Sequence, residues 1–299
     1  MSIVKSEIFD YEQSKVYLES LCREYPFITA NVIGRTSLSR SIFSLSLGNP
    51  KNSVLYVGGF HGSEWITCLA LYKFIERLSY EIKHKNLLCS VDVCKAFSNL
   101  GITVIPCINP DGVEINRKGP ESAKGLRHFV ESLGCEDYSK WNANASGVDI
   151  NHNFNAGWDI LSGMEKEKGI TGPSPRQYGG EHPESEAETK ALCRLCRLKD
   201  FRQVMAVHSQ GEELYWKYGE NTPKTSCIMA KIIADSCGYT LVSNDGLASH
   251  GGFKDWFIEE FARPGFTIEI GKGENPLPVS QLDSIYKKIE EALLVFALM

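Results

Sequence analysis

The sequence lacks the features that mark several classes of protein. No uninterrupted apolar run reaches the roughly 18 residues that a membrane-spanning helix needs. The N-terminal residues have neither the basic start nor the apolar core and small-residue cleavage site of a signal peptide. Acidic residues also outnumber basic ones, 37 to 32, which gives a formal net charge of -5. We therefore expect no nucleic-acid partner and no membrane partner, and we expect a cytoplasmic location.

Short motifs of nucleotide-binding proteins and serine hydrolases are also missing. No G-x-S-x-G, P-loop or G-x-G-x-x-G follows a strand-like run, and the chain has no repeat or flexible linker. With 42% hydrophobic and 23% charged residues, the composition is that of a soluble globular protein. A length of 299 residues suits one α/β unit, so we expect a single domain over residues 1–299.

Cysteine, in contrast, is plentiful, with ten residues. Without a secretion signal, reduced thiols are a better expectation than a disulfide framework. Cys193 and Cys196 form a C-x-x-C pair, but their segment has helical spacing and no second pair follows at zinc-ribbon distance. This pattern argues against a redox or structural-zinc role.

Strand-like and helix-like segments alternate along the chain. Helical spacing of apolar residues predicts helices in four segments, residues 10–25, 63–80, 182–198 and 278–299. Short apolar runs predict strands within six segments, residues 27–34, 40–48, 52–60, 101–112, 202–211 and 263–276. The first two strands should form an antiparallel edge pair, and the strand after Gly101 should end in an Asn-Pro-Asp-Gly turn. The fold class expected is α/β, a three-layer α/β/α sandwich around a mixed, mostly parallel twisted sheet.

Two histidines and a carboxylate stand where such a sheet would bind a ligand, at the carboxyl ends of strands. His61 and Glu64 follow the run VLYVGGF, and His208 ends the run VMAV. An H-x-x-E pair alone is weak, and His208 alone could be a core histidine. Together they are the ligand set of a catalytic zinc site whose fourth position is left to water.

Glu269 lies inside the apolar run GFTIEIG, where a carboxylate is costly to bury unless it is paired or used. Beside a zinc-bound water it would serve as a general base. The structural alternative is an ion pair with Arg263. His152, in DINHNFNAGW, is open to more readings: a ligand, an acid-base group, a substrate contact or a structural histidine.

Five ordered motifs carry a family resemblance. GGFHGSEW, NPDG, GVDINHNF, HSQGEELYW and GFTIEIGKGENP resemble the zinc carboxypeptidase superfamily, the carboxypeptidase A clan or peptidase family M14, from Arg40 to the final helix. NHNF, HSQGEE, GGFKDWF and IEIGKGENPLP are most similar to bacterial γ-D-glutamyl-diaminopimelate peptidases, which cut murein peptides. The resemblance implies one zinc ion per chain on His61, Glu64 and His208, with Glu269 as general base.

The resemblance also implies substrate contacts. Asn151 and His152 match the Asn-Arg pair with which carboxypeptidases grip a terminal carboxylate, but here histidine replaces arginine. A guanidinium binds a carboxylate through two parallel hydrogen bonds, whereas an imidazole offers one contact and a pH-dependent charge. Lys254 matches the base of the pocket for the leaving residue, where an ammonium would favour the second carboxylate of meso-diaminopimelate. Its alternative is a lysine that extends to solvent.

Two family features have no secure counterpart. For the oxyanion-stabilising arginine, Asn142 stands at the nearest match, with Arg117 and Arg127 as further candidates. The tyrosine that closes over the substrate has none, since Leu247 falls near its place. The zinc ion, or another residue, would then contribute more to stabilising the transition state.

The function expected is a zinc metallopeptidase that cleaves the γ-D-glutamyl-meso-diaminopimelate bond of small murein peptides in a bacterial cytoplasm. Three alternatives stay open. They are an ordinary metallocarboxypeptidase acting on α-linked C-terminal residues, a zinc N-acyl amino acid deacylase of the aspartoacylase type, and a catalytically silent peptide-binding protein. The extended GVDINHNFNAGW region fits the peptidases better than the deacylases.

Overall fold

A computed structural model describes residues 2–5, 7–242 and 250–299 of the chain. Within these residues, one central sheet contains the eight strands β1 (Thr29–Arg35), β2 (Ser41–Gly48), β3 (Ser53–Gly58), β6 (Gly101–Ile105), β7 (Val204–His208), β8 (Glu213–Tyr215), β9 (Thr240–Val242) and β10 (Gly265–Glu269). Their order across the sheet is β1-β2-β6-β3-β7-β10-β8-β9. A separate two-stranded hairpin joins β4 (Leu87–Leu88) to β5 (Val91–Asp92).

The sheet is mixed and mostly parallel, as the sequence predicts. The four central strands β6, β3, β7 and β10 are parallel neighbours, whereas β2 and β8 pair antiparallel on either side of them. The expected antiparallel edge pair of β1 and β2 is confirmed. Parallel strands need helical crossovers, which explains why strands and helices alternate along the chain.

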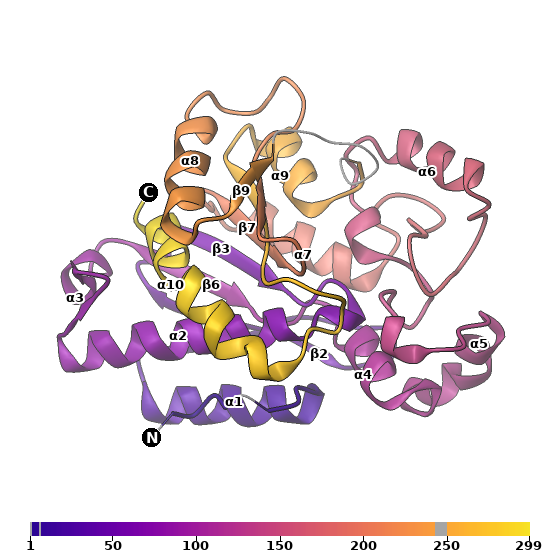
Figure 1. Cartoon of the computed structure of the whole chain (residues 1–299), viewed down its shortest axis with the longest axis horizontal. Helices are drawn as coiled ribbons and strands as arrows, with labels where there is room; N and C mark the ends of the chain where they lie inside the picture. The colour runs from indigo at the N-terminus through magenta and orange to yellow at the C-terminus, as the bar shows by residue number, and fades with distance from the viewer. Residues whose placement is uncertain (1, 6, 243–249) are drawn as a thin grey trace.

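Helices cover both faces of this sheet. The helices of the described residues are α1 (Tyr11–Glu24), α2 (Ile66–His84), α3 (Val93–Ala96), α4 (Pro110–Lys118), α5 (Arg127–Ser132), α6 (Trp158–Glu167), α7 (Ala187–Leu198), α8 (Ser226–Cys237), α9 (Phe253–Phe261) and α10 (Leu282–Leu298). In Figure 1, α10 crosses in front of the sheet and the fainter α7 lies behind it. Among the described residues, no helix combines the length and apolarity needed to cross a bilayer.

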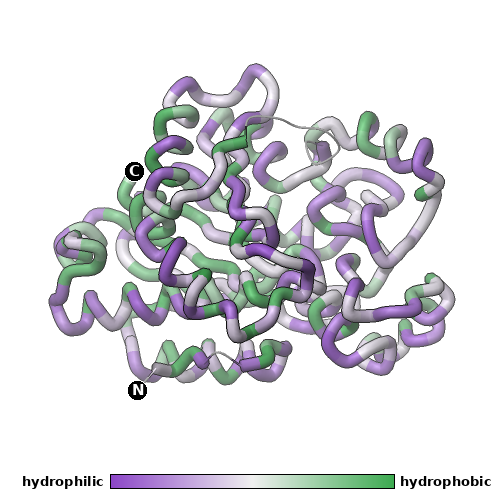
Figure 2. The backbone as a smooth tube through the Cα atoms, in the orientation of Figure 1, coloured by the Kyte–Doolittle hydropathy of each residue, from purple (hydrophilic) through white to green (hydrophobic). Residues whose placement is uncertain are grey.

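The central strands face two separate hydrophobic cores. Val54 and Tyr56 of β3 belong to one core, with residues of α1, α2, α8 and α10. The alternating residues Leu55 and Val57 belong to the other, with residues of α7 and α9. Because side chains alternate along a strand, this double burial makes the sheet the middle of three layers. Figure 2 shows the apolar stretches concentrated in the strands and in the faces of these helices.

The Asn-Pro-Asp-Gly segment is not a turn, and the prediction there is wrong. Asn109 caps α4 instead, because its Oδ1 accepts a hydrogen bond from the Gly112 backbone N–H at 2.8 Å. Pro110 then occupies the first helical position, where its missing N–H costs nothing and its fixed φ suits a helix. α4 therefore begins directly after β6, and Figure 1 shows α4, α5 and α6 grouped at one end of the sheet.

The helix predicted from residue 182 begins later, at Ala187. The residues before it are held by the loop around Asn153, which accepts hydrogen bonds from the backbone N–H groups of Glu184 at 2.6 Å and Glu186 at 3.1 Å. All ten cysteines are free thiols. Cys193 and Cys196 face the second core, and burial raises the pKa of both thiols.

Candidate metal centre and active site

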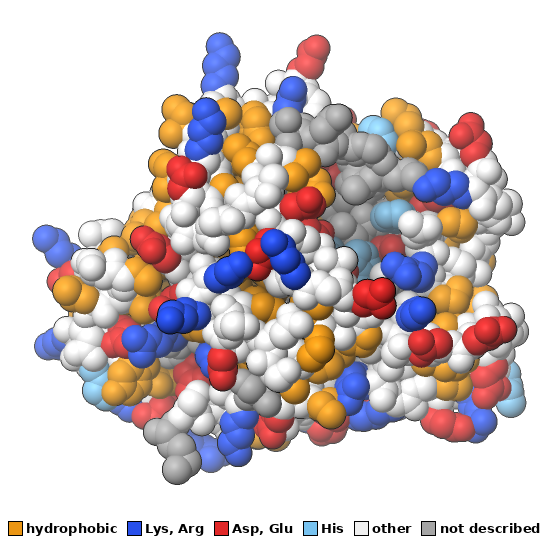
Figure 3. All heavy atoms as spheres, in the orientation of Figure 1, with side chains coloured by type: hydrophobic (Ala, Val, Ile, Leu, Met, Phe, Trp, Pro, Cys, Tyr) orange, Lys and Arg blue, Asp and Glu red, His pale blue; other side chains and the backbone are white. Residues whose placement is uncertain are grey.

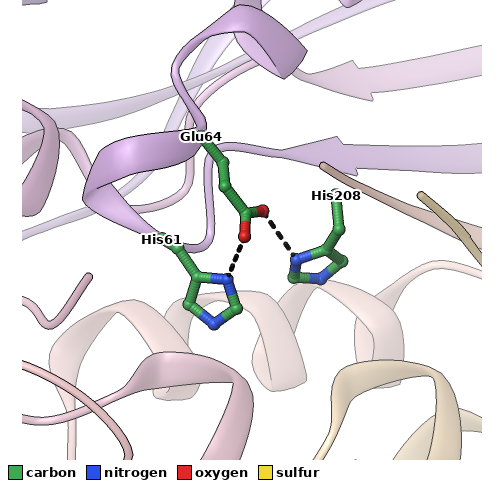
Figure 4. A group of neighbouring side chains, drawn as sticks. All are labelled: His61, Glu64 and His208. Carbon is green, nitrogen blue, oxygen red and sulfur yellow. Dashed lines mark hydrogen bonds and ion pairs between the residues drawn. The ribbon is translucent and has the colours of Figure 1, made fainter. Parts of the chain in front are cut away.

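His61, Glu64 and His208 meet at the carboxyl edge of the sheet. His61 follows β3, Glu64 ends the short 3-10 helix η1 (Gly62–Glu64), and His208 is the last residue of β7. Because β3 and β7 are parallel neighbours, with Gly58 opposite Val207, their ends lie at the same edge. The Glu64 carboxylate lies between the two imidazoles, with Oε1 2.8 Å from Nδ1 of His61 and Oε2 3.0 Å from Nδ1 of His208 (Figure 4).

This cluster has the composition and geometry of a zinc site. One ligand atom from each of the three residues lies within 4.8 Å of the others. The Nε2 atom of His61 is 3.0 Å from Oδ1 of Asp149, so a proton on Nε2 leaves the Nδ1 lone pair directed at the centre of the cluster. Two imidazoles and one carboxylate leave a coordination position open, as in catalytic zinc sites.

The charges of the cluster are strongly coupled. Burial alone would raise the pKa of Glu64, but the two histidines hold the pKa of this carboxyl at about 2. Burial opposes a charge on His61, yet Glu64 and Asp149 raise the pKa of the imidazole well above its usual value. His61 in turn holds the pKa of Asp149 well below its usual range against the effect of burial. The carboxylates stay ionised, which suits a cation-binding site.

Glu269 lies directly beside this cluster. It ends β10, and the parallel register places it opposite His208 on β7. Burial and the neighbouring Glu64 carboxylate raise the pKa of Glu269 well above its usual value. The ion pair considered for Glu269 is not formed, because Arg263 pairs with Asp200 at 2.6 Å.

A polar pocket of about 520 Å³ opens over the cluster. Its wall includes His61 and Glu64 of the cluster, and it also includes Glu269. The remaining lining residues are mostly polar or charged: Ser63, Lys140, Asn142, Asp149, His152, Arg176, Gln177, Ser209, Gln210, Glu213, Tyr215, Glu274 and Asn275. In Figure 3, pale-blue histidine side chains are visible in a hollow right of centre, with acidic and basic side chains around it.

His152 lines this pocket, and Asn151 lines a second, smaller pocket next to it. Both belong to the 3-10 helix η4 (Ile150–His152). Nδ1 of His152 is 2.8 Å from Oε1 of Glu165, so the other ring nitrogen is the one free to meet a ligand. Burial opposes the imidazolium, but Asp149 and Glu165 raise the pKa of His152 above its usual value. Asn151 accepts a hydrogen bond from the Phe253 backbone N–H at 3.1 Å.

Lys254 lies in a smaller pocket of about 80 Å³, which shares Tyr215 and Glu269 with the larger one. Only 7% of the lysine is exposed. Its Nζ donates to the Lys217 carbonyl at 3.0 Å and forms an ion pair with Asp255. The alternative of a lysine that extends to solvent is therefore wrong.

Of the three oxyanion candidates, only Asn142 lines the larger pocket. Its Oδ1 accepts a hydrogen bond from Ser63 Oγ at 2.5 Å. Arg117 lies over the Trp65 ring instead, 5.1 Å from its centroid. Arg127 is exposed and forms ion pairs with two glutamates on the surface. Leu247, at the place of the closing tyrosine, lies outside the described residues.

Several lining residues escaped the sequence reasoning. Asp149 carried no signal for its contact with His61, because the two residues are 88 positions apart in the chain. Lys140, Arg176 and Tyr215 carried none either, since only the packing of segments that are distant in the sequence brings them to the pocket.

Comparisons with known proteins agree with this geometry. The sequence profile of the family described as zinc carboxypeptidase matches residues 15–292. The γ-D-glutamyl-L-diamino acid endopeptidase 1 of Lysinibacillus sphaericus is 32% identical over 290 residues, which cover 96% of this chain and 71% of that protein.

Solved structures share the fold. The crystal structure of thrombin-activatable fibrinolysis inhibitor superposes with a TM-score of 0.77 at 19% identity, over 98% of this chain and 74% of that one. A murein-tripeptide amidase from Escherichia coli O157 gives a TM-score of 0.55 at 21% identity, over 89% of this chain and 91% of that one.

Proposed function

Because the chain belongs to the zinc carboxypeptidase family and is therefore a metallopeptidase, we propose that it hydrolyses the γ-D-glutamyl-meso-diaminopimelate bond of murein peptides. The observation that carries the substrate assignment is Lys254, a buried cation in a pocket that opens beside Glu269. The name of the Lysinibacillus relative, an endopeptidase for γ-D-glutamyl-L-diamino acid bonds, supports the same bond. A bacterial cytoplasmic location stays a prediction.

His61, Glu64 and His208 would hold one zinc ion per chain. When bound, zinc supplies Lewis acidity, which polarises the scissile carbonyl and lowers the pKa of water. Asp149 holds the His61 ring in the orientation that presents Nδ1 to the metal.

Glu269 is the proposed general base. It takes a proton from the attacking water and passes it to the nitrogen of the leaving amino acid, so the peptide bond breaks and a carboxylate and an amine are released. Its position opposite His208 puts this carboxyl group at the same edge of the sheet as the candidate metal cluster, where a general base is needed.

Asn142 is the proposed oxyanion donor. Since Ser63 donates to its Oδ1, the amide of Asn142 is oriented and its N–H groups remain available to the pocket. A fixed donor at this place would stabilise the negative charge that develops on the carbonyl oxygen.

Lys254 and His152 are proposed to hold the leaving residue. The Lys254 ammonium, already next to Asp255, would bind the side-chain carboxylate of meso-diaminopimelate. His152 would contact the terminal carboxylate through the ring nitrogen that Glu165 does not occupy, with Asn151 beside it. A single imidazole contact is weaker than the two-bond grip of a guanidinium, which disfavours an ordinary carboxypeptidase specificity.

The decisive experiment compares L-Ala-γ-D-Glu-meso-diaminopimelate with its L-lysine analogue, with products identified by mass. We expect release of free diaminopimelate and much slower cleavage of the lysine peptide. Lys254→Met should abolish this preference, whereas the exposed Lys51→Gln should keep it. The preference is a ratio within one protein sample, so partial unfolding of Lys254→Met does not affect it.

Other outcomes would contradict the proposal. Equal cleavage of both peptides by the unaltered enzyme would remove the role given to Lys254. Trimming of α-linked peptides with no cleavage of either γ-linked peptide would make the enzyme an ordinary metallocarboxypeptidase.

A further inference from the structure

Lys140 and Arg176 are the two cationic side chains, besides histidines, in the lining of the larger pocket. Both are exposed at its rim. Within the described ranges, neither side chain forms a hydrogen bond or an ion pair, although Glu213 and Glu274 line the same pocket. Lys254 differs, because it is buried and paired with Asp255. Two unpaired cations at the rim are therefore free to meet an anionic group of a ligand.

Backbone hydrogen bonds hold these two residues side by side. The N–H groups of Asn142 and Ala143 both donate to the Pro175 carbonyl at 3.0 Å. Lys140 lies two residues before Asn142 and Arg176 directly follows Pro175, so one junction presents both side chains.

The same junction is tied to the metal centre. The backbone N–H of Gln177 donates to Oδ2 of Asp149 at 3.2 Å, and the other oxygen of Asp149 binds His61. The Arg176 segment is thus fixed relative to the reacting bond, and it is not a loosely placed surface loop.

The arrangement also indicates which side of the scissile bond the cations face. The small pocket that holds Lys254 shares Tyr215 and Glu269 with the larger pocket, but neither Lys140 nor Arg176 lines it. Glu269 lines both pockets, so a substrate whose leaving residue enters the small pocket has its scissile bond near Glu269 and extends its acyl part into the larger pocket. Its acyl part then lies against Lys140 and Arg176.

We propose, resting on the proposed function, that Lys140 and Arg176 bind the free α-carboxylate of the D-glutamyl residue and so select γ-linked substrates. In a γ-linkage the scissile carbonyl comes from the glutamate side chain, and the α-carboxylate is retained as an anion nearby on the acyl side. An α-linked peptide uses that carboxyl in the bond itself and offers no such anion there. A guanidinium and an ammonium together match this carboxylate in charge and in donor number.

The test replaces the α-carboxylate of D-glutamate with a neutral carboxamide in L-Ala-γ-D-Glu-meso-diaminopimelate. A third peptide carries a carboxamide in place of the terminal carboxylate of the diaminopimelate residue. For the unaltered enzyme, kcat/KM should fall about tenfold on the α-amidated peptide, mainly through KM, because two exposed ionic contacts are worth about that much.

The double variant Lys140→Gln/Arg176→Gln should lose this discrimination. Its kcat/KM values for the parent peptide and for the α-amidated peptide should lie within about twofold of each other. The charge-preserving variant Lys140→Arg/Arg176→Lys should keep most of it. Lys51→Gln, which removes an exposed charge before β3 at the opposite edge of the sheet, should behave as the unaltered enzyme.

Three outcomes would overturn the inference while the proposed function stands. They are equal cleavage of the carboxylate and α-amide peptides by the unaltered enzyme, equal losses on both peptides in the double variant, and a double variant that loses discrimination against the peptide amidated on diaminopimelate while it keeps discrimination against the α-amidated peptide. If the unaltered enzyme cleaves no γ-linked peptide, the proposed function fails and this inference fails with it.

Discussion

Glu269 and Glu188 are carboxyl groups in similar electrostatic surroundings, but only one of them opens on a pocket. For both, burial and a neighbouring carboxylate raise the pKa; the neighbour is Glu64 for Glu269 and Asp111 for Glu188. Glu188, on α7, is fully buried and its pKa is raised to about 8. Asn144 donates to one of its oxygens at 3.4 Å, and the other oxygen has no hydrogen-bond partner among the described residues.

The difference between the two lies in access and in neighbours. Glu269 borders a pocket and stands opposite His208 of the candidate metal cluster, whereas Glu188 is enclosed by the protein. A raised pKa therefore does not by itself identify a catalytic group. It marks a site only where a ligand can reach the group.

The largest expected effect is that of metal removal. Chelation should abolish peptide hydrolysis, and added zinc should restore it. Elemental analysis should find one zinc per chain in the Glu188→Gln variant but none in the Glu64→Gln variant. This result would show that zinc binding needs the carboxylate in the pocket and not the enclosed one. Full activity in protein shown to be metal-free would contradict the zinc assignment.

Next in size is the effect of Glu269→Gln. Loss of the general base should lower kcat by about a thousandfold or more while zinc stays bound, because the metal ligands are untouched. Steady-state kinetics and elemental analysis on the same preparation measure both. Normal turnover would show that Glu269, like Glu188, is only a buried carboxyl group.

Asn142→Ala tests a neutral group on the same pocket. Removal of one oxyanion donor should lower kcat on the order of a hundredfold, with little change in KM. Ser63→Ala, which frees the amide without removing it, should have a smaller effect in the same direction. Arg127→Gln serves as the control, because its ion pairs lie on the surface. A larger loss in Arg127→Gln than in Asn142→Ala would reverse the assignment.

Glu188→Gln should leave kcat/KM unchanged and act on stability alone. Its pKa is about 8 in the folded protein and near 4.5 in the unfolded chain, so the folded state holds a proton that the unfolded state has lost. Stability is full below about pH 4.5 and falls by up to about 1.4 kcal/mol per pH unit as pH rises to about 8.

Denaturant unfolding at a series of pH values measures this dependence. In Glu188→Gln the decline should be reduced and the protein should be more stable at pH 8. Glu181→Gln, which removes an exposed carboxylate earlier in the same segment, is the matched control. An unchanged pH profile in Glu188→Gln would show that this residue is ionised in the folded protein.

The cluster of His61, Glu64, His208 and Glu269 could be predicted because each residue ends or closely follows an apolar strand run, and parallel strands end at one edge. The enclosure of Glu188 could not be predicted, because an acidic residue near a helix start looks like an ordinary charge at a helix N-terminus. Nor could Lys140 and Arg176, whose positions depend on hydrogen bonds to Pro175 across more than thirty residues of chain.

The fold elements that the sequence did not indicate include α9, β8 and β9. In α9, Phe253 to Ile258 are all buried, so the helix shows no alternation of apolar and polar faces. The strands β8 and β9 have three residues each, too few for a periodic signal. The single domain over residues 1–299 stays a prediction.

The register that places Glu269 opposite His208 has a consequence for engineering. The proposed base and one metal ligand are built into neighbouring strands of a sheet that is packed on both faces. Lys140 and Arg176 instead belong to connecting segments, which tolerate exchange better than strands do. Preference can therefore be changed at single side chains, and exchanging Lys140 and Arg176 for the residues of a relative, with Asn142 kept, should retune the substrate without rebuilding the catalyst.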